Sequence, residues 1–204
     1  MSSIDDLLEN LKSSGVKLDK NVESAFKSVN IEDFVDYSVE GFWQDKPVTF
    51  MTTMAGAEKN ISAPHMIATL LHHLEIRNGQ HFLLIGSKGG YLAAILDQLL
   101  GINGIVTIIE PHNEVLEHTI DTLEKYNSKG IIRVLSASSM DYFEDFEKPV
   151  DRVLITGAIR EIPKFLEVIL QDGAFVLGPF GGTIQQRLLK REKNFNQWLD
   201  TCLL

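Results

Sequence analysis

A glycine-rich turn between an apolar run and a helical pattern constrains the fold of this chain more than any other feature. Residues 81–85 are largely apolar, the turn Gly86-Ser87-Lys88-Gly89-Gly90 follows directly, and a helical pattern begins just beyond it. The order strand, glycine turn, helix is how an α/β sheet presents backbone N–H groups and a helix N-terminus to a small ligand. The turn alone is a weak signal, because many glycine turns only connect a strand to a helix.

A second apolar run strengthens the signal. Residues 104–109 are apolar apart from Thr107, and the run ends in Glu110. A carboxylate at the tip of the neighbouring strand can accept hydrogen bonds from both hydroxyls of a ribose. The glycine turn and the spaced acid together predict a ligand that contains a nucleoside.

The rest of the chain alternates strand and helix patterns. The expected strands cover residues 81–85, 105–109, 131–135, 150–155 and 174–177. The expected helices cover residues 63–74, 91–100, 113–126 and 161–170. This alternation is typical of a doubly wound, mainly parallel α/β sheet. Residues 184–189 and 195–204 can supply two further strands, as a hairpin that adds antiparallel pairing.

The first 60 residues read as a cover for this sheet. Helical spacing runs from residue 4 to residue 27 and is interrupted at Gly15, so we expect two short helices there. Residues 29–50 are irregular and rich in aromatic side chains. We therefore expect one domain over residues 1–204, with an N-terminal helical cap at 1–60 and an α/β core at 61–204.

Composition narrows the class of protein. The 204 residues carry a formal net charge of −9, with 44% hydrophobic and 23% charged residues, which is typical of a soluble globular protein. The acidic balance argues against a nucleic-acid partner. No apolar run is long enough to span a membrane, and the acidic N-terminus lacks a signal peptide, so we expect a cytoplasmic protein without a membrane partner. We identify no metal ligands.

The single cysteine, Cys202, permits no internal disulfide, which suits a reducing compartment. Cys202 lies in an apolar tail over residues 199–204. We therefore expect its thiol to be buried as a small hydrophobic group and not to act as a nucleophile.

Two cofactor chemistries fit this arrangement, a nicotinamide dinucleotide or S-adenosylmethionine. The dinucleotide fingerprint requires G-x-G-x-x-G at the first turn, and residues 86–90 do not fit it. A helical cap before the first strand and a strand pair at the end favour a methyltransferase. The predicted class is a Rossmann-like class I methyltransferase fold.

The segment Asn60-Ile61-Ser62-Ala63-Pro64-His65-Met66 stands ahead of the glycine turn. With that turn, it resembles the protein-L-isoaspartate O-methyltransferase family, whose members carry T-I-S-A-P-H-M before L-E-I-G-x-G-x-G-Y. The resemblance extends over nearly the whole chain. Residues 29–35 are similar to V-P-R-x-x-F-V, residues 45–47 to D-x-P, and residues 151–158 to D-R-I-x-x-T-A-A.

The resemblance implies methyl transfer from S-adenosylmethionine to the free α-carboxylate of L-isoaspartyl residues in damaged proteins or peptides, which starts their repair. This acceptor is already ionised and the sulfonium is a good leaving group, so alignment and exclusion of water matter more than a catalytic base. The implied substrate-binding residues are Ile61, Ser62 and His65, with Ser62 orienting the carboxylate as the catalytic residue. The implied cofactor-binding residues are Gly86, Ser87, Gly89, Gly90, Glu110, Pro111 and Ser139.

Two of these residues have a second interpretation. Ser62 can cap the N-terminus of the helix that follows, with Pro64 in its first turn, a role compatible with substrate binding. The spacing of His65 favours packing over contact with a substrate.

The chain departs from the family pattern at three places near the cofactor. Leu84 replaces the family's acid, Lys88 replaces the middle glycine, and Ser139 stands where the family has the aspartate of G-D-G. Lys88 can repel the sulfonium or pair with the methionine carboxylate of the cofactor. Three hypotheses stay open: an active isoaspartyl methyltransferase with a rearranged cofactor site, a relative that keeps the fold for binding or assembly, and a methyltransferase with another acceptor.

Overall fold

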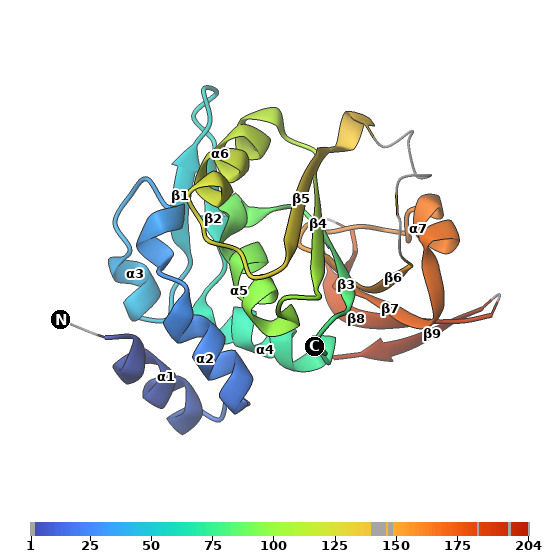
Figure 1. Ribbon diagram of the computed structural model, residues 1–204, viewed down its shortest axis with the longest axis horizontal. Coiled ribbons are helices and arrows are strands. Elements are labelled where there is room, and N and C mark those ends of the chain that lie inside the picture. The colour runs from blue at the N-terminus through green and yellow to red at the C-terminus, as the bar shows by residue number, and fades with distance from the viewer. Residues whose placement is uncertain (1–2, 140–145, 147–148, 183, 196, 204) are drawn as a thin grey trace.

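A seven-stranded sheet forms the centre of the computed structural model (Figure 1), which describes residues 3–139, 146, 149–182, 184–195 and 197–203. The strand order is β5-β4-β3-β6-β7-β8-β9. The strands are β3 (His81–Ile85), β4 (Ile105–Glu110), β5 (Ile131–Ser136), β6 (Val150–Ile155), β7 (Leu170–Gly181), β8 (Gln186–Asn194) and β9 (Gln197–Cys202). Strands β3 to β7 pair in parallel, whereas β8 and β9 add antiparallel pairs. This confirms the predicted mainly parallel sheet and its antiparallel tail.

Helices bury their apolar faces against both sides of the sheet. The helices of the core are α4 (Pro64–Leu74), α5 (Tyr91–Leu100), α6 (Asn113–Glu124) and α7 (Lys164–Ile169). Leu84 of β3 belongs to the cluster that includes α4 and α5, while the preceding Leu83 belongs to the cluster that includes α7. Successive side chains of β3 therefore enter opposite layers, which explains why a strand buried on both faces is continuously apolar.

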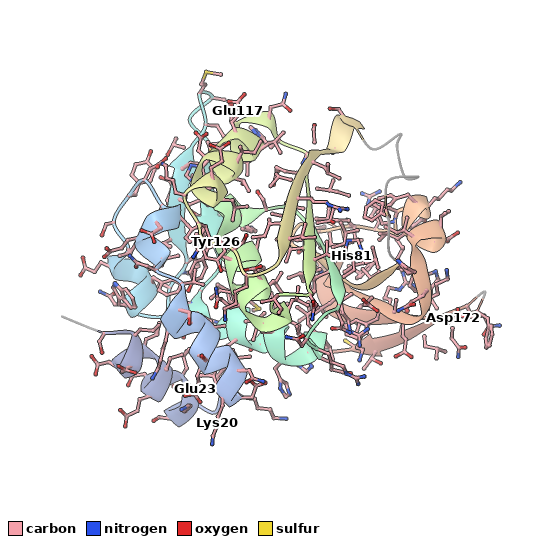
Figure 2. The ribbon with its side chains drawn as sticks, viewed as in Figure 1. Lys20, Glu23, His81, Glu117, Tyr126 and Asp172 are labelled. Atoms are coloured by element: carbon pink, nitrogen blue, oxygen red, sulfur yellow. The ribbon has the colours of Figure 1, made fainter. Side chains whose placement is uncertain are left out.

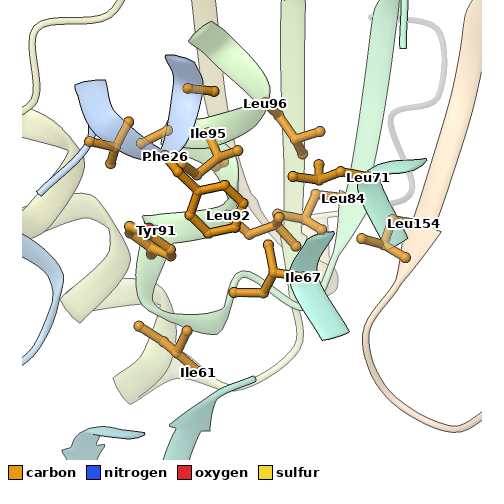
Figure 3. Close-up of a cluster of buried hydrophobic side chains, with 14 of the residues drawn as sticks. Phe26, Ile61, Ile67, Leu71, Leu84, Tyr91, Leu92, Ile95, Leu96 and Leu154 are labelled. Atoms are coloured by element: carbon orange, nitrogen blue, oxygen red, sulfur yellow. The ribbon is translucent and has the colours of Figure 1, made fainter. Parts of the chain in front are cut away.

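Figure 3 shows the larger cluster at the point where α4 and α5 meet the sheet. Leu84 and Leu154 come from adjacent strands and contact a layer that includes Ile67, Leu71 and Leu92. Charged side chains such as Lys20, Glu117 and Asp172 lie at the periphery (Figure 2). Among the described residues, no helix combines the length and the apolar character of a membrane span.

The N-terminal segment begins with the two predicted helices. Helix α1 (Ile4–Ser13) starts with a capping box between Ser3 and Asp6, and α2 (Lys20–Ser28) is capped by Asp19. Their apolar faces join the same buried cluster as α5. The boundary between a cap at 1–60 and a core at 61–204 stays a prediction.

The following segment is more regular than predicted. It contains the short helices η1 (Ile31–Phe34) and α3 (Glu40–Trp43) and an antiparallel hairpin of β1 (Val48–Thr52) and β2 (Glu58–Ile61). The sequence predicts an irregular region over 29–50 and no strand there. A register shift between Thr49 and Met51 interrupts the hairpin, and this bulge breaks the alternation by which a strand is recognised.

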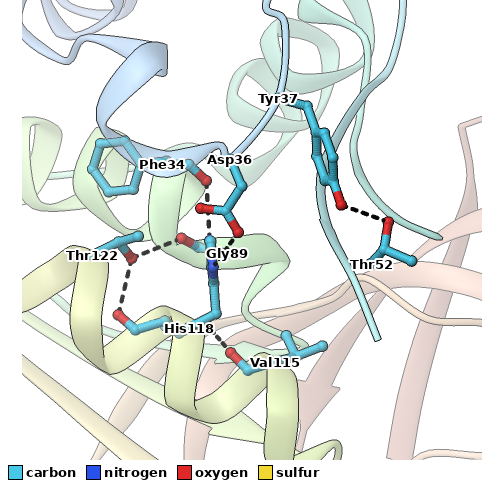
Figure 4. Close-up of polar contacts among 9 residues, drawn as sticks. Phe34, Asp36, Tyr37, Thr52, Gly89, Val115, His118 and Thr122 are labelled. Carbon is cyan, nitrogen blue, oxygen red and sulfur yellow. Dashed lines mark hydrogen bonds and ion pairs between the residues drawn. The ribbon is translucent and has the colours of Figure 1, made fainter. Parts of the chain in front are cut away.

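Polar contacts fasten this segment to α6, and α6 to the glycine turn (Figure 4). The His118 ring of α6 lies 3.2 Å from the backbone oxygen of Phe34 and 3.6 Å from the Asp36 carboxylate. The Thr122 hydroxyl donates to the backbone oxygen of Gly89 at 3.0 Å. Helix α6 therefore supports the cap on one side and the turn after β3 on the other.

The C-terminal part corrects two predictions. Helix α7 begins only at Lys164, because Pro163 precedes it, and the chain enters β7 directly at Leu170. Cys202, expected to be buried, is exposed. It lies in β9, the edge strand of the sheet, which has a neighbour on one side only.

A buried carboxylate holds the connection that leads into β5. Asp97 of α5 accepts hydrogen bonds from the backbone N–H groups of Lys129 and Gly130, both at 2.8 Å, and from the Tyr126 hydroxyl at 3.0 Å. Asp97→Ala should lower the free energy of unfolding by about 3 kcal/mol, because hydrogen bonds to a charged group are lost and buried donors lose their partner. Urea unfolding measures the change. Asp121→Ala, on the exposed side of α6, is the control and should change it by less than about 0.5 kcal/mol. Equal effects of both substitutions would contradict this role of Asp97.

Candidate functional site

A buried carboxylate joins the ends of β3 and β4. Glu110 is 4% exposed, and its Oε2 accepts a hydrogen bond from the backbone N–H of Ser87 at 2.7 Å. The Ser87 hydroxyl lies 2.8 Å from the same oxygen, and the backbone N–H of His112 donates to Oε1 at 2.9 Å. The turns that follow the two strands therefore share one anchor.

The glycines of the first turn are required by packing. Gly86 has a φ of +89°, and a Cβ there would lie 2.2 Å from the Thr156 hydroxyl, which donates to the Gly86 carbonyl. Gly89 has a φ of +72° and lies against the ring of Phe50, where a Cβ would come within 2.7 Å. Gly90, with a φ of +93°, lies against α6. Only glycine adopts such backbone angles without a steric penalty.

A cavity of about 490 Å³ opens where β3, β4 and β6 end. Gly86 and Lys88 border it after β3, Glu110 to His112 after β4, and residues 155–159 at the end of β6. The chain enters β3 and then adds β4 on one side and β6 on the other, so the cavity lies at the switch point of the sheet, where α/β proteins bind ligands. Its volume lies within the range usual for small-molecule sites.

A second cavity of about 300 Å³ lies beside the first. Its walls include Ile61, Ser62 and Met66 at the start of α4, and Pro179 and Arg187 from β7 and β8. Most of the remaining lining is apolar. Lys88, Ile155 and Thr156 border both cavities, so the two spaces meet at these residues.

Lys88 has an unusual setting at this boundary. Its φ is +50°, which is uncommon for a residue other than glycine. Burial lowers the pKa of the Lys88 ammonium; the negative charge of Glu110 opposes this effect, and the positive charge of Lys59 adds to it. The ammonium is therefore held in a setting that favours a counter-charge.

The three predicted substrate-binding residues do not lie together in one cavity. Ile61 and Ser62 line the second cavity. Ser62 is not the helix cap: α4 begins at Pro64, and Ala63 occupies the cap position without a side-chain hydrogen bond. His65 lines neither cavity, and its Nδ1 lies 2.9 Å from Asp45 Oδ2. Contact of these residues with a substrate stays a prediction.

Three of the predicted cofactor-binding residues, Gly86, Glu110 and Pro111, line the first cavity. Ser87 is fully buried and supports Glu110. Gly89 and Gly90 line neither cavity and pack against the protein. Their contact with a cofactor stays a prediction.

Leu84 and Ser139, two of the departures from the family pattern, lie in different settings. Leu84 is 0% exposed and packs in the core, away from both cavities. Ser139 ends the short helix η3 (Ala137–Ser139), and its side chain lies outside the described part of the chain. Binding of an adenine by Ser139 stays a prediction.

Sequence reasoning missed Lys88, His112 and Thr156 as site residues. Nδ1 of His112 is buried beside the first cavity and has no hydrogen-bond partner among the described residues. Thr156 directly follows β6, and the switch-point rule applied to the predicted strands would have found it. Lys88 stood out in the sequence as the residue that replaces the family's middle glycine, but the sequence did not place its side chain at the boundary of the two cavities.

Comparisons with known proteins agree on one family. The family model described as Protein-L-isoaspartate(D-aspartate) O-methyltransferase (PCMT) matches residues 2–201. The protein-L-isoaspartate O-methyltransferase of Methanococcus maripaludis (strain S2) is 31% identical over 186 residues, or 91% of this chain and 84% of the relative. The protein of the same name from Pyrobaculum arsenaticum is 28% identical over 193 residues, or 92% of this chain and 91% of the relative.

Solved structures share the fold. One named protein-L-isoaspartate O-methyltransferase has a TM-score of 0.84 at 20% identity and covers 99% of this chain, which spans 63% of that longer chain. A Plasmodium falciparum protein described as a putative protein-L-isoaspartate O-methyltransferase, in complex with S-adenosyl-L-homocysteine, has a TM-score of 0.77 at 20% identity. The match covers 100% of this chain and 95% of the Plasmodium falciparum chain. At this identity the likeness establishes the fold alone, and it confirms the predicted class I methyltransferase fold.

The turn after β3 can be tested through its glycine. Gly86→Ala should lower the free energy of unfolding by about 2–4 kcal/mol, because the new Cβ meets the Thr156 hydroxyl and the backbone angle is strained. Thermal unfolding measures the change. Gly157→Ala is the matched control, because Gly157 lines the same cavity and a Cβ there meets no atom within 4 Å. A loss at Gly157 as large as that at Gly86 would refute the packing argument.

Proposed function

Since the chain belongs to the protein-L-isoaspartate(D-aspartate) O-methyltransferase family, we propose that its two adjoining cavities hold the two partners of a methyl transfer. The protein is an S-adenosylmethionine-dependent methyltransferase of protein repair, and its acceptor is the α-carboxylate of an L-isoaspartyl residue. The observation that carries the assignment of the cavities is their common boundary. Because Lys88, Ile155 and Thr156 border both spaces, a donor in one can reach an acceptor in the other.

The first cavity fits the cofactor. Oε1 of Glu110 accepts one protein hydrogen bond, from His112, which leaves acceptor capacity for ribose hydroxyls. Nδ1 of His112, which has no hydrogen-bond partner among the described residues, supplies a further polar contact, and Pro111 offers an apolar surface to an adenine ring. When bound there, S-adenosylmethionine supplies an electrophilic methyl group on its sulfonium.

The second cavity fits the acceptor. An isoaspartyl α-carboxylate is ionised at neutral pH, so it needs orientation and not a general base. The Ser62 hydroxyl can donate a hydrogen bond to one carboxylate oxygen and direct the other toward the boundary. The apolar walls exclude water, which would otherwise solvate the carboxylate and reduce its nucleophilicity.

Damaged proteins and peptides with isoaspartyl residues are the proposed partners. We also propose a cytoplasmic location. The single cysteine, which excludes an internal disulfide, supports that location.

The reaction is tested through Ser62. The wild type should methylate a peptide with an isoaspartyl linkage and leave the same peptide with a normal aspartyl linkage unchanged. Ser62→Ala should lower the rate of methyl ester formation by roughly 10- to 1000-fold, because one orienting hydrogen bond is lost. Transfer of radiolabelled methyl groups measures the rate.

The melting temperature and the affinity for S-adenosylmethionine should barely change, since Ser62 does not cap α4. Ser24→Ala, on the exposed side of α2, controls for the loss of a serine hydroxyl elsewhere. A wild type that binds the cofactor and methylates neither peptide would refute the repair activity and favour another acceptor. A wild type that binds no cofactor would favour a relative that keeps only the fold.

The cofactor position is tested through Glu110. Glu110→Gln should weaken the binding of S-adenosylmethionine by about 10- to 100-fold, because a charged acceptor of ribose hydroxyls is lost. Isothermal titration calorimetry measures the dissociation constant at a temperature at which both proteins are folded. Glu114→Gln, at the start of α6 and outside the first cavity, is the control. An unchanged dissociation constant in Glu110→Gln would mean that Glu110 is only the anchor of the two turns.

A further inference from the structure

Lys88 stands at the boundary between the two cavities, where a methyl donor and its acceptor must meet. We propose that the Lys88 ammonium binds the acceptor carboxylate of the substrate and thereby selects for an anionic acceptor. The inference rests on the function proposed above and adds a residue that the family pattern, with glycine at this place, does not supply.

The charge of the second cavity supports this role. The charged residues among its described lining are Lys88 and Arg187, and neither is an acid. The chain as a whole carries a net charge of −9, so a cavity whose charged side chains are all cationic departs from the average of the molecule. Such a cavity favours an anionic ligand.

Among the described residues, no acid forms an ion pair or a hydrogen bond with the Lys88 ammonium. Glu110 is the acid that acts on the pKa of Lys88, but its carboxylate already accepts hydrogen bonds from Ser87 and His112. A partly buried ammonium without a partner costs free energy, and a carboxylate from outside the protein offsets that cost.

The backbone at Lys88 is held in a conformation that glycine adopts more easily. Its φ of +50° lies in the left-handed region, and the next two residues are both glycines in that region. Strain of this kind persists where the surrounding structure enforces it, and it concentrates at functional sites. Here it directs a long cationic side chain to the boundary of the two cavities.

A carboxylate has two sources in this reaction, the acceptor and the methionine end of the cofactor. The acceptor is favoured because Lys88 also borders the cavity that contains Ser62. A carboxylate held between the ammonium and the sulfonium separates two like charges that would otherwise repel each other. The same position faces a carboxylate oxygen toward the methyl group.

The test compares Lys88→Met with the wild type, since Met is also long, unbranched and flexible but carries no charge, and it keeps the same backbone strain. In steady-state methylation of an isoaspartyl peptide, Lys88→Met should raise KM by roughly 10- to 100-fold with a smaller change in kcat. Lys88→Arg should restore much of the affinity. Lys164→Met is the matched control and should change KM by less than about threefold, because Lys164 is exposed at the start of α7 and lines neither cavity.

Calorimetry with the unreactive pair of isoaspartyl peptide and S-adenosylhomocysteine measures peptide affinity without turnover. Weaker binding of the peptide to Lys88→Met than to the wild type supports the inference, whereas equal affinity of both proteins overturns it. A loss of affinity for S-adenosylhomocysteine, but not for 5′-methylthioadenosine, which lacks the carboxylate, also overturns it and assigns Lys88 to the cofactor. Failure of the wild type to methylate the peptide contradicts the proposed function, and the calorimetric comparison still decides the role of Lys88.

Discussion

The buried carboxylate of Glu110 is the contact on which the arrangement of both cavities depends. A carboxylate removed from water must be satisfied by hydrogen bonds, and here they come from the turn after β3 and from the turn after β4. The two strand ends are thereby held in one geometry. The turn after β3 then leads directly to Lys88, so the anchor that shapes the first cavity also positions the residue that borders the second.

The sheet could be predicted because its strands are local patterns. Runs such as 81–85 are buried on both faces and are bounded by glycine turns, and both signals lie within a few residues. The β1–β2 hairpin was not predicted, because its bulge at Thr49 and Met51 breaks the alternation of buried and exposed side chains by which a strand is recognised. The burial of Cys202 was predicted wrongly, because a residue in an apolar tail is buried only where a neighbouring strand covers it, and β9 is an edge.

The residues of the site likewise divide into those that local patterns predict and those that they do not. The positions of Gly86 and Glu110 beside the first cavity could be predicted from spacing alone, because Gly86 directly follows one recognisable strand and Glu110 ends the next. Thr156 lies beside Gly86 because β6 pairs with β3, about seventy residues away in the chain; the switch-point rule predicts this place, but no local pattern does. Lys88 departs from the family pattern, and sequence alone could not decide whether its side chain turned toward the ligand or away. Its place was decided by the left-handed backbone of the turn and the packing of Gly89 on Phe50.

The walls of the two cavities have different origins in the chain. The first is built mainly by the parallel strands and the turns that follow them, with the β1–β2 hairpin on one side, whereas Pro179 and Arg187 of the second come from the antiparallel pair β7 and β8. Changes in that hairpin can reshape one cavity while leaving the Glu110 anchor untouched. Over evolutionary time, descendants of such a protein can acquire new acceptors by drift in a single hairpin and inherit the donor site intact.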